Sequence, residues 1–396
     1  MTRTTNISFH KLKIDLEKSH GSYLYDSNSQ SEFLDFFGMY SALTFGYNHE
    51  ITKGESYQKD ILRASTVKVT NCEMLTEEYE DFVREFSNFA VPDNFSSLHL
   101  ACTGGLAVEG GIKTALYHSS KKRGIPRDSC VVSFCGGFHG ITSYGNFTTD
   151  RFGPAERRLS GFPDLGWPKI QNLSELQDLI DSGKNIGGVI IEPIQCTVGD
   201  NCFSDEFLTE LRKITQDNNI PLIFDEVQTG FCSSGSVWYF QRFDWTPDII
   251  IFGKKSQVSG FFVKKEFDSI FDQTQAGRLC ITFDGDLVDL VRCTHVIKYI
   301  QQHAILDNIN ARAIQFREGL SAFPIKNIRN AGLLFCWDFN SADDRDKFVS
   351  KLKVNRMLCN PTGEKSIRMR PCLTVTAEEI TIGIDLIKKT LLELRE

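Results

Sequence analysis

The stretch 249–260, IIIFGKKSQVSG, decides the fold, because it places two lysines directly behind a run of bulky apolar residues. A continuous apolar run suits a strand that helices cover on both faces, as in a parallel sheet. The run ends at Gly253, and Lys254 and Lys255 follow. A lysine behind a buried strand is unusual, because a buried ammonium group is costly, although its charge can also extend to the surface. The stretch therefore predicts a buried strand with one lysine of interest at its end.

Three further apolar runs have the same character: CVVSFCGG at 130–137, GGVIIEPIQ at 187–195 and IPLIFDEVQ at 220–228. Each is nearly continuous and ends in a polar or glycine-rich tail. Helix-like segments lie between them, at 174–183 and 205–218. Ligands of open α/β sheets gather at the carboxyl ends of the strands. The pattern predicts an α/β fold whose chemistry lies in these tails.

Length and composition exclude several classes of protein. A chain of 396 residues can form a large core and two domains. With a net charge of −7 and no basic cluster, we expect no nucleic-acid partner. No run approaches the ~20 apolar residues of a membrane helix, and residues 1–20 lack the apolar centre of a secretion signal. The 12 cysteines are scattered without metal-ligand spacing, so we expect no metal site and free, buried thiols in a reducing cytoplasm.

The sequence changes character near residue 284. A long helical stretch at 286–305 is followed by IRNAGLLFCWDF at 328–339, and the chain ends in an amphipathic helix. Thr376 and Glu379 form a capping-box pattern before that helix. The apolar stripe of the helix consists of Ile380, Ile384, Ile387, Leu391 and Leu394. These features predict three parts: an N-terminal segment 1–45 packing with the small domain, a large domain 46–284 and a smaller C-terminal α/β domain 285–396.

An acid and a lysine close two successive strands, 29 positions apart. Asp225 ends the run IPLIF, and Lys254 follows the next run. Taken alone, Asp225 is better explained as a helix cap or a solvated turn acid. For Lys254 the alternative is a surface lysine. Together they match the needs of pyridoxal phosphate (PLP), whose aldehyde forms a Schiff base with a lysine and whose pyridine nitrogen needs a carboxylate to stay protonated.

Two other tails supply the remaining parts of a cofactor site. In CTGGLAVEGGIKTALYHS, Gly104 and Gly105 lie where a helix begins, and free N–H groups with the helix dipole attract a phosphate there. Phe138 and His139 end the first run, where an aromatic ring can stack on a flat cofactor. A plain glycine turn and simple packing are the alternatives for these four residues.

With these motifs the chain resembles the class III PLP-dependent aminotransferases of fold type I, and most closely their L-lysine 6-aminotransferase branch. The resemblance runs from about residue 20 to the end. The motifs that carry it are LDFFGMYSALTFGYNHE, GGLAVEGGIK, FHG, IIEPIQ with GDN, FDEVQTGF, PDIIIFGKKSQVSG, ITFDGDLVDLVR and SIRMRPCLTV.

The resemblance implies a role for each matching residue. Lys254 matches the Schiff-base lysine, and Asp225 matches the partner of the pyridine nitrogen. Val227 and Phe138 would pack on the two faces of the ring, and Gln228 would lie near its phenolic oxygen. Lys255 is the rival lysine, but neighbouring side chains of an extended segment point to opposite faces, so only one can reach the cofactor.

Further matches concern the phosphate and the substrate. Gly104 and Gly105 match the phosphate loop. Thr282 matches a threonine that reaches the phosphate of the partner subunit, which implies a homodimer with shared sites. Arg368 matches an arginine that binds a substrate carboxylate.

The sequence departs from the family pattern where substrate binds. Ile141 stands where the lysine and ornithine enzymes have an arginine that holds the amino-acid carboxylate, which isoleucine cannot do. Thr197 stands where a glutamate neutralises the substrate-binding arginine. Asp284 and Asp286 are two additional acids beside Thr282. We expect Asp286 to cap a helix, whereas Asp284 is equally a turn residue or a new charge on the substrate side of the pocket.

We therefore predict a homodimeric, cytoplasmic, PLP-dependent aminotransferase. It would move an amino group from an amine or amino acid, as lysine 6-aminotransferases do, to a keto acid or aldehyde. The alternative is another PLP reaction on the same fold, such as decarboxylation, racemisation or carbon–carbon bond formation. A non-catalytic scaffold fits less well, because the residues for the cofactor are all present.

Overall fold

The computed structural model describes residues 10–395 apart from 71–73, 125, 127, 151–163, 273 and 275. Its centre is a seven-stranded sheet with the order β3-β11-β10-β9-β6-β4-β5. The strands are β3 (Phe95–Ala101), β4 (Cys130–Phe134), β5 (Lys169–Ile170), β6 (Ile186–Ile191), β9 (Leu222–Asp225), β10 (Ile249–Phe252) and β11 (Ser259–Lys264).

The four apolar runs form four adjacent strands of this sheet, as predicted. β4, β6, β9 and β10 are fully buried along their length, and neighbours among them pair in parallel. Burial on both faces explains why these runs are continuous rather than alternating. β11 is the exception, because it pairs antiparallel with β10 and with β3. The prediction of a mostly parallel sheet between helices is confirmed.

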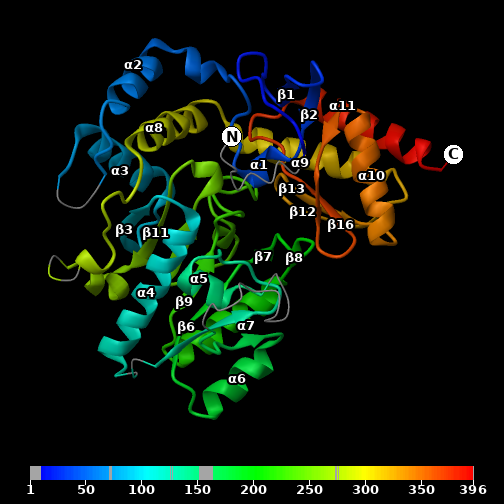
Figure 1. Ribbon diagram of the computed structural model, residues 1–396. Helices are drawn as coiled ribbons and strands as arrows, with labels where there is room; N and C mark the ends of the chain where they lie inside the picture. Colours follow the sequence, from blue (N-terminus) through cyan, green and yellow to red (C-terminus); the bar gives the residue numbers. More distant parts are fainter. Residues whose placement is uncertain are drawn as a thin grey trace, which may run out of the picture.

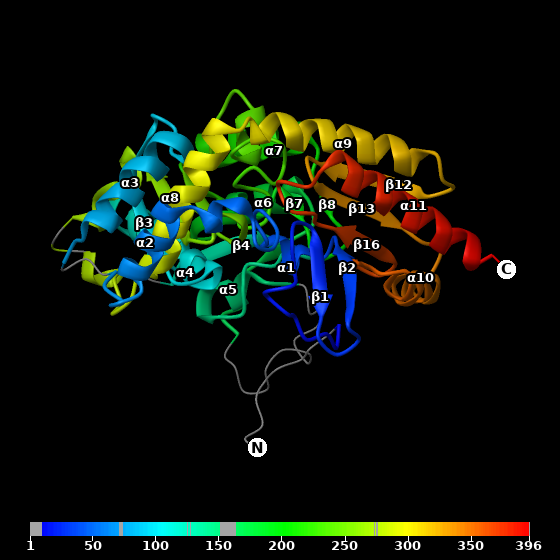
Figure 2. The same cartoon turned by 90° about the horizontal axis from the view of Figure 1, so that it is seen from above.

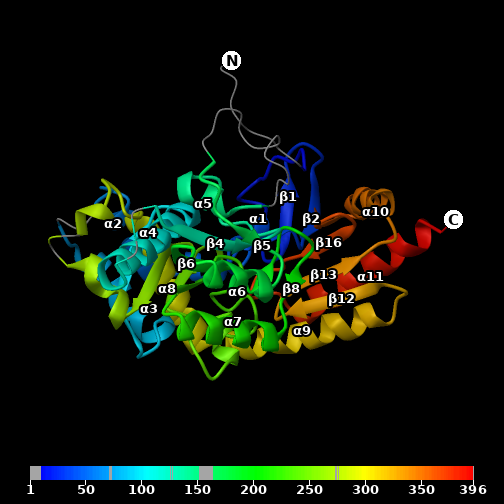
Figure 3. The ribbon, with the colours of Figure 1, turned by 90° about the horizontal axis from the view of Figure 1, so that it is seen from below.

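Helices cover both faces of the sheet. Figures 2 and 3 show α4 and α5 on one face and α7 on the opposite face. Glycines at 110, 111 and 188 let α4 approach closely, since a Cβ at Gly110 would lie 2.3 Å from the ring of Phe261. The helices of this region are α2 (Glu55–Ala64), α3 (Glu77–Ala90), α4 (Gly104–Lys122), α5 (Ser143–Thr148), α6 (Leu173–Asp181), α7 (Asp205–Asp217) and α8 (Leu287–Gln302).

The C-terminal part is a second, smaller α/β unit beside the large sheet (Figure 1). Its antiparallel sheet has the order β12-β13-β16-β15, and three helices pack around it. The strands are β12 (Lys326–Ala331), β13 (Leu334–Asp338), β15 (Asn360–Thr362) and β16 (Ser366–Met369). The helices are α9 (Ile305–Ser321), α10 (Ala342–Val354) and α11 (Ala377–Glu393).

The N-terminal chain joins this smaller unit. β1 (Tyr23–Asp26) and β2 (Ser31–Asp35) form a hairpin, and β2 continues in parallel with β14 (Met357–Leu358). The short helix α1 (Gly38–Ser41) follows and lies against the turn Lys254–Ser256 behind β10. The exact division at residues 45 and 284 stays a prediction, and the first nine residues of the N-terminal segment lie outside the described ranges.

Local signals in the sequence agree with the structure. Asp286 caps α8 by accepting the N–H of Val288, and Thr376 and Glu379 form the predicted capping box of α11. The eleven described cysteines are free and seven of them are buried, while Cys72 lies outside the described residues. Among the helices that the structure describes, none has the length and the apolar character needed to cross a bilayer.

Candidate active site

A cavity of about 230 Å³ lies at the carboxyl ends of the parallel strands. It brings together every predicted cofactor-binding residue except Thr282. Three further residues, Val108, Gly140 and Glu192, complete its lining. The predicted residues in it are Gly104, Gly105, Phe138, His139, Asp225, Val227, Gln228 and Lys254.

The strand register places Asp225 and Lys254 beside each other. β9 and β10 pair in parallel with Asp225 opposite Ile251, three residues before Lys254. Burial lowers the pKa of Lys254 to about 8, and the positive charge of Arg368 acts in the same direction. At pH 7 a lysine with this pKa has about a tenth of its amine neutral and nucleophilic, far more than an ordinary lysine.

The two lysines separate as predicted, but for a different reason. The strand ends at Phe252, and Lys254 to Ser256 form a 3-10 turn rather than an extended segment. Lys254 has a left-handed backbone with φ of 55°, which turns its side chain into the cavity. Lys255 is buried elsewhere, where its Nζ donates to the carbonyls of Leu43 at 2.7 Å and Pro371 at 3.0 Å. The expectation of extended backbone at these lysines is therefore wrong.

Asp225 is fixed by two hydrogen bonds. Its Oδ2 lies 2.8 Å from Nδ1 of His139, and its Oδ1 accepts the N–H of Val227 at 3.2 Å. Both Asp225 and His139 are buried. A carboxylate with these partners has one orientation, in which it can act on a ligand in the cavity.

The first turn of α4 forms one wall. Thr103 caps the helix by accepting the N–H of Leu106, and Gly104 and Gly105 follow. A Cβ at Gly104 would lie 3.3 Å from Cγ1 of Val227, so glycine leaves the helix end open toward the cavity. The N–H groups at the start of this 19-residue helix are suited to an anion such as a phosphate.

Glu192 is a cavity residue that we did not single out from the sequence. It follows β6, and its Oε1 accepts the N–H of Phe138 at 2.8 Å. Burial raises its pKa to about 7, and the neighbouring His139 opposes this shift. The signal was present, since Glu192 ends an apolar run in IIEPIQ just as Asp225 ends IPLIF.

Two arginines of SIRMRPCLTV have different surroundings. Arg368 on β16 donates through Nη1 to the carbonyl of Cys196 at 2.7 Å, and its guanidinium lies 5.6 Å from the ring centre of Tyr40. Arg370 forms an ion pair in which its Nη2 donates to both carboxylate oxygens of Asp200, at 2.6 and 2.7 Å, and its Nε donates to Gln228 at 3.2 Å. The pair of Arg370 with Asp200 was not anticipated from the sequence, although both lie within motifs of the resemblance.

The predicted substrate residues other than Gln228 lie outside the lining of this cavity. Thr197 follows Cys196, and its buried hydroxyl has no hydrogen-bond partner among the described residues. Ile141 follows Gly140 of the lining and is 63% exposed.

Thr282 lies in an exposed loop, and the nearby Asp284 is buried. The Oδ1 of Asp284 accepts the N–H of Ile281 at 2.8 Å. Within the described ranges, no group of three or more His, Cys, Asp or Glu side chains is placed to hold a metal ion.

A parallel α/β sheet whose strand ends present a lysine, a buried acid and a glycine-rich helix start defines a transferase of the PLP-dependent fold type I. The comparison with known families agrees with this class. The chain belongs to the class-III aminotransferase family, whose model matches residues 5–391.

Individual relatives support the same activity. The chain is 27% identical to the L-lysine-epsilon aminotransferase of Streptomyces clavuligerus, covering 94% of this chain and 88% of that protein. It is 26% identical to a probable mitochondrial 4-aminobutyrate aminotransferase of Caenorhabditis elegans, covering 98% and 89%. The solved lysine aminotransferase of Mycobacterium tuberculosis in its internal aldimine form is 26% identical, with a TM-score of 0.89 over 98% of this chain and 96% of that one. This protein is thus an enzyme that transfers amino groups.

Proposed function

We propose that the cavity at the strand ends binds pyridoxal 5′-phosphate and that Lys254 is the residue to which the cofactor attaches. The observation that carries the proposal is the convergence of four groups in one cavity: the amine of Lys254, the carboxylate of Asp225, the ring of Phe138 and the start of α4 at Gly104. Each suits one part of the cofactor, namely its aldehyde, ring nitrogen, ring face and phosphate.

The chemistry of the cavity residues suits pyridoxal phosphate. The amine needs a pKa near neutrality, and that of Lys254 is lowered to about 8 by burial. The acid needs a fixed orientation, which His139 and the Val227 N–H give to Asp225. The phosphate needs an open helix end, which Gly104 and Gly105 provide.

When bound, the cofactor supplies an electron sink for the bond that breaks at the substrate carbon. Asp225 would hold a proton at the ring nitrogen, and His139 would keep that carboxylate in place. Lys254 would carry a proton to and from the substrate carbon, a task that suits an amine whose pKa lies near the working pH. Val227 and Phe138 would confine the ring, and Gln228 would lie near its phenolic oxygen.

The substrate proposal rests on Arg368, on Ile141 and on Thr197, whose hydroxyl carries no charge that could neutralise Arg368. Arg368 would bind the carboxylate of a keto-acid acceptor, as a fixed guanidinium suits a carboxylate. Ile141 offers no second carboxylate site, so the amino donor would be one that does not depend on such a clamp. Lysine and ornithine should accordingly be poor donors. Asp284 could add negative charge on the substrate side, although its bond to the Ile281 N–H favours a role within its own loop.

We also propose a homodimer with shared sites. Ile281 and Phe283 flank Thr282 and are 51% and 40% exposed. The neighbouring segment around Thr70, whose carbonyl accepts the Asp284 N–H, adds the exposed Val67, Met74 and Leu75. A second copy covering this apolar surface would bring Thr282 to the neighbouring phosphate site. The free thiols support a reducing compartment such as the cytoplasm.

Borohydride reduction of the PLP-loaded protein, followed by peptide mapping, tests the cofactor proposal. The pyridoxyl label should be found on Lys254, and it should be lost in Lys254→Ala. A label on Lys255 would show that the wrong lysine has been assigned. No label with intact, folded protein would overturn the cofactor site. A screen of amines and keto acids with products identified by mass then defines the substrate pair.

A further inference from the structure

The turn that carries Lys254 is held by bonds from outside the large sheet. Lys254 and Gln257 have left-handed backbones, with φ of 55° and 61°. Residues other than glycine rarely adopt this conformation, so surrounding contacts must stabilise it. Several of those contacts involve the next residue, Lys255.

The ammonium of Lys255 links two distant segments. Its side chain is only 2% exposed, and its Nζ donates to the carbonyls of Leu43 and Pro371. Among the described residues, no carboxylate lies within ion-pair distance of it. A buried charge that binds only carbonyls is costly, and an apolar residue of similar length would fill the space without that cost. Packing alone therefore does not explain a lysine at position 255.

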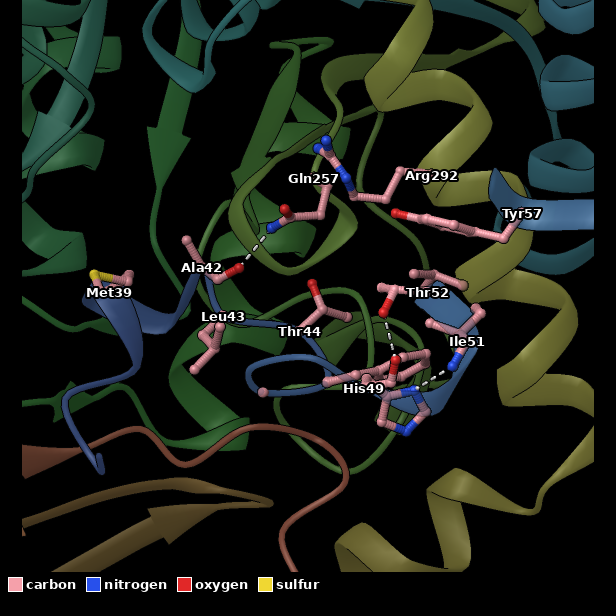
Figure 4. A pocket seen from close by; sticks show the side chains of 13 residues that line it. Met39, Ala42, Leu43, Thr44, His49, Ile51, Thr52, Tyr57, Gln257 and Arg292 are labelled. Atoms are coloured by element: carbon pink, nitrogen blue, oxygen red, sulfur yellow. Dashed lines mark hydrogen bonds between the residues drawn. The ribbon is translucent and has the colours of Figure 1, made fainter. Parts of the chain in front are cut away.

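Two further bonds fasten the same turn to the same segment. The Thr44 hydroxyl donates to the carbonyl of Lys255 at 2.6 Å. The Gln257 amide donates to the carbonyl of Ala42 at 2.6 Å and to that of Lys254 at 3.1 Å. Figure 4 shows the bond between Gln257 and Ala42 and the run of residues 42–44 beside it. The backbone from Lys254 to Gln257 thus cannot shift without moving residues 42–44.

Both segments lead to the proposed substrate side. Leu43 lies three residues after Tyr40, and Pro371 lies three residues after Arg368. The ring of Tyr40 and the guanidinium of Arg368 are themselves in contact at 5.6 Å. One ammonium group therefore connects the turn of Lys254 with the two chain segments that carry this pair.

We propose that Lys255 is a positioning residue for amino transfer, which holds Lys254 in register with Tyr40 and Arg368. This inference rests on the proposed role of Lys254. It predicts that losing the ammonium lets the turn relax, exposes Lys254 to water and moves its amine away from the reacting carbon. An error of about 1 Å in such a placement can lower a rate about a hundredfold.

The test compares Lys255→Met with Lys264→Met. Lys264 is a matched control, because its partly buried Nζ also donates to a carbonyl, that of Thr246, and its pKa is likewise lowered by burial. It lies on β11 and bonds Asp248, away from the cavity lining. The readout is the pH profile with which an acylating reagent labels Lys254 in the cofactor-free protein, measured by peptide mass spectrometry.

In Lys255→Met, the apparent pKa of Lys254 should rise, and a rise of one unit would slow its labelling at pH 7 about tenfold. In the loaded enzyme kcat should fall at least about tenfold while KM for the keto acid changes little. Lys264→Met should change neither. An unchanged profile and kcat in Lys255→Met, or equal changes in both variants, would overturn the inference.

Two precautions keep the outcome decisive. If Lys255→Met does not fold, Thr44→Val removes only the hydroxyl bonded to the Lys255 carbonyl and should give a smaller change in the same direction. The borohydride label separates the two proposals. A wild-type label away from Lys254 refutes the cofactor assignment, whereas a label on Lys254 with an unchanged profile in Lys255→Met refutes only the positioning role.

Discussion

Asp225 and His139 form a buried pair at the carboxyl end of the sheet, with 2.8 Å between Oδ2 of the acid and Nδ1 of the imidazole. The residues are 86 positions apart in the sequence. The carboxylate closes β9, and the imidazole follows β4, with β6 lying between the two strands. The hydrogen bond thus reaches across the end of β6. It fixes the orientation of the acid on which the proposed chemistry depends.

Replacing Asp225 with Asn should therefore abolish most of the activity while the cofactor still binds. Asn keeps the shape but not the charge that would hold a proton at the ring nitrogen. We expect kcat to fall about a hundredfold to ten-thousandfold, the range for losing acid–base assistance. Steady-state kinetics with visible absorbance of the loaded protein checks this. Asp225→Glu, which keeps the charge, should retain more activity than Asn, and a near-native Asn variant would exclude the assigned role.

Mixing two inactive variants tests the shared site. Lys254→Ala lacks the attachment lysine, and Thr282→Ala should impair the contribution to the other subunit while leaving the proposed apolar interface intact. If each site combines Lys254 of one copy with Thr282 of the other, a mixed dimer contains one site with both residues intact. About half of the dimers that form from equal amounts of two variants are mixed, so about a quarter of the wild-type activity should return. Light scattering shows whether dimers form. Dimers whose mixtures stay inactive would contradict the shared site.

Restoring two family residues should change the choice of substrate. Ile141→Arg together with Thr197→Glu would supply a carboxylate clamp and a partner for Arg368. We expect kcat/KM for lysine with 2-oxoglutarate to rise about tenfold to a hundredfold, since a charge-assisted hydrogen bond contributes about 1.5–3 kcal/mol. Ile141→Leu is the control and should leave kcat/KM for lysine unchanged. No gain in the double variant would show that other walls of the pocket exclude lysine.

Lys255 should also affect stability as a function of pH. Burial lowers its pKa from the ordinary 10.5 to about 8, so the unfolded chain binds more protons than the folded protein between these two values. Folding stability should consequently rise with pH across the window from about 8 to 10.5, by at most about 3 kcal/mol from this group. Neighbouring groups that act on the Lys255 charge are Cys372, Arg370, Asp35 and Cys232.

Urea unfolding of the cofactor-free protein at several pH values measures this effect. The measurement is made in a Lys254→Ala background, with and without Lys255→Met, because Lys255→Met is itself expected to shift the pKa of Lys254. In that background Lys255→Met should gain stability at pH 7 from the removed charge, offset by two carbonyls that lose their donor. A difference that stays constant between pH 8 and 10.5 would mean that Lys255 is not buried as a charge.

The sequence predicted the parts of the fold and the site that depend on local pattern. Continuous apolar runs identified β4, β6, β9 and β10, because strands buried on both faces tolerate no alternation. Their tails pointed to Asp225 and Lys254, because parallel strands end at one edge. β11 was not recognised, because its apolar stretch FFV is short and follows directly after the turn that carries the lysines.

The remaining site depends on contacts between distant segments, which no local pattern reports. Arg370 pairs with Asp200 across 170 positions. Lys255 binds Leu43 across 212 positions. The turn at Lys254 escaped prediction because its left-handed backbone is imposed by such contacts and not by its own residue type.

The pairing of β2 with β14 has a consequence for how the protein matures on the ribosome. Residues 31–44 leave the exit tunnel well before their partners at Met357–Leu358 and Pro371 are synthesised. Contacts of such sequence separation form slowly, and until they form the turn of Lys254 lacks its anchor. In the nascent chain the large sheet can form first. The N-terminal hairpin then stays without its partner strand β14 until that strand has been synthesised. Competence to take up the cofactor should thus arise only after residues 357–371 have left the tunnel, and a ribosome stalled before residue 357 should hold a folded sheet that does not retain pyridoxal phosphate.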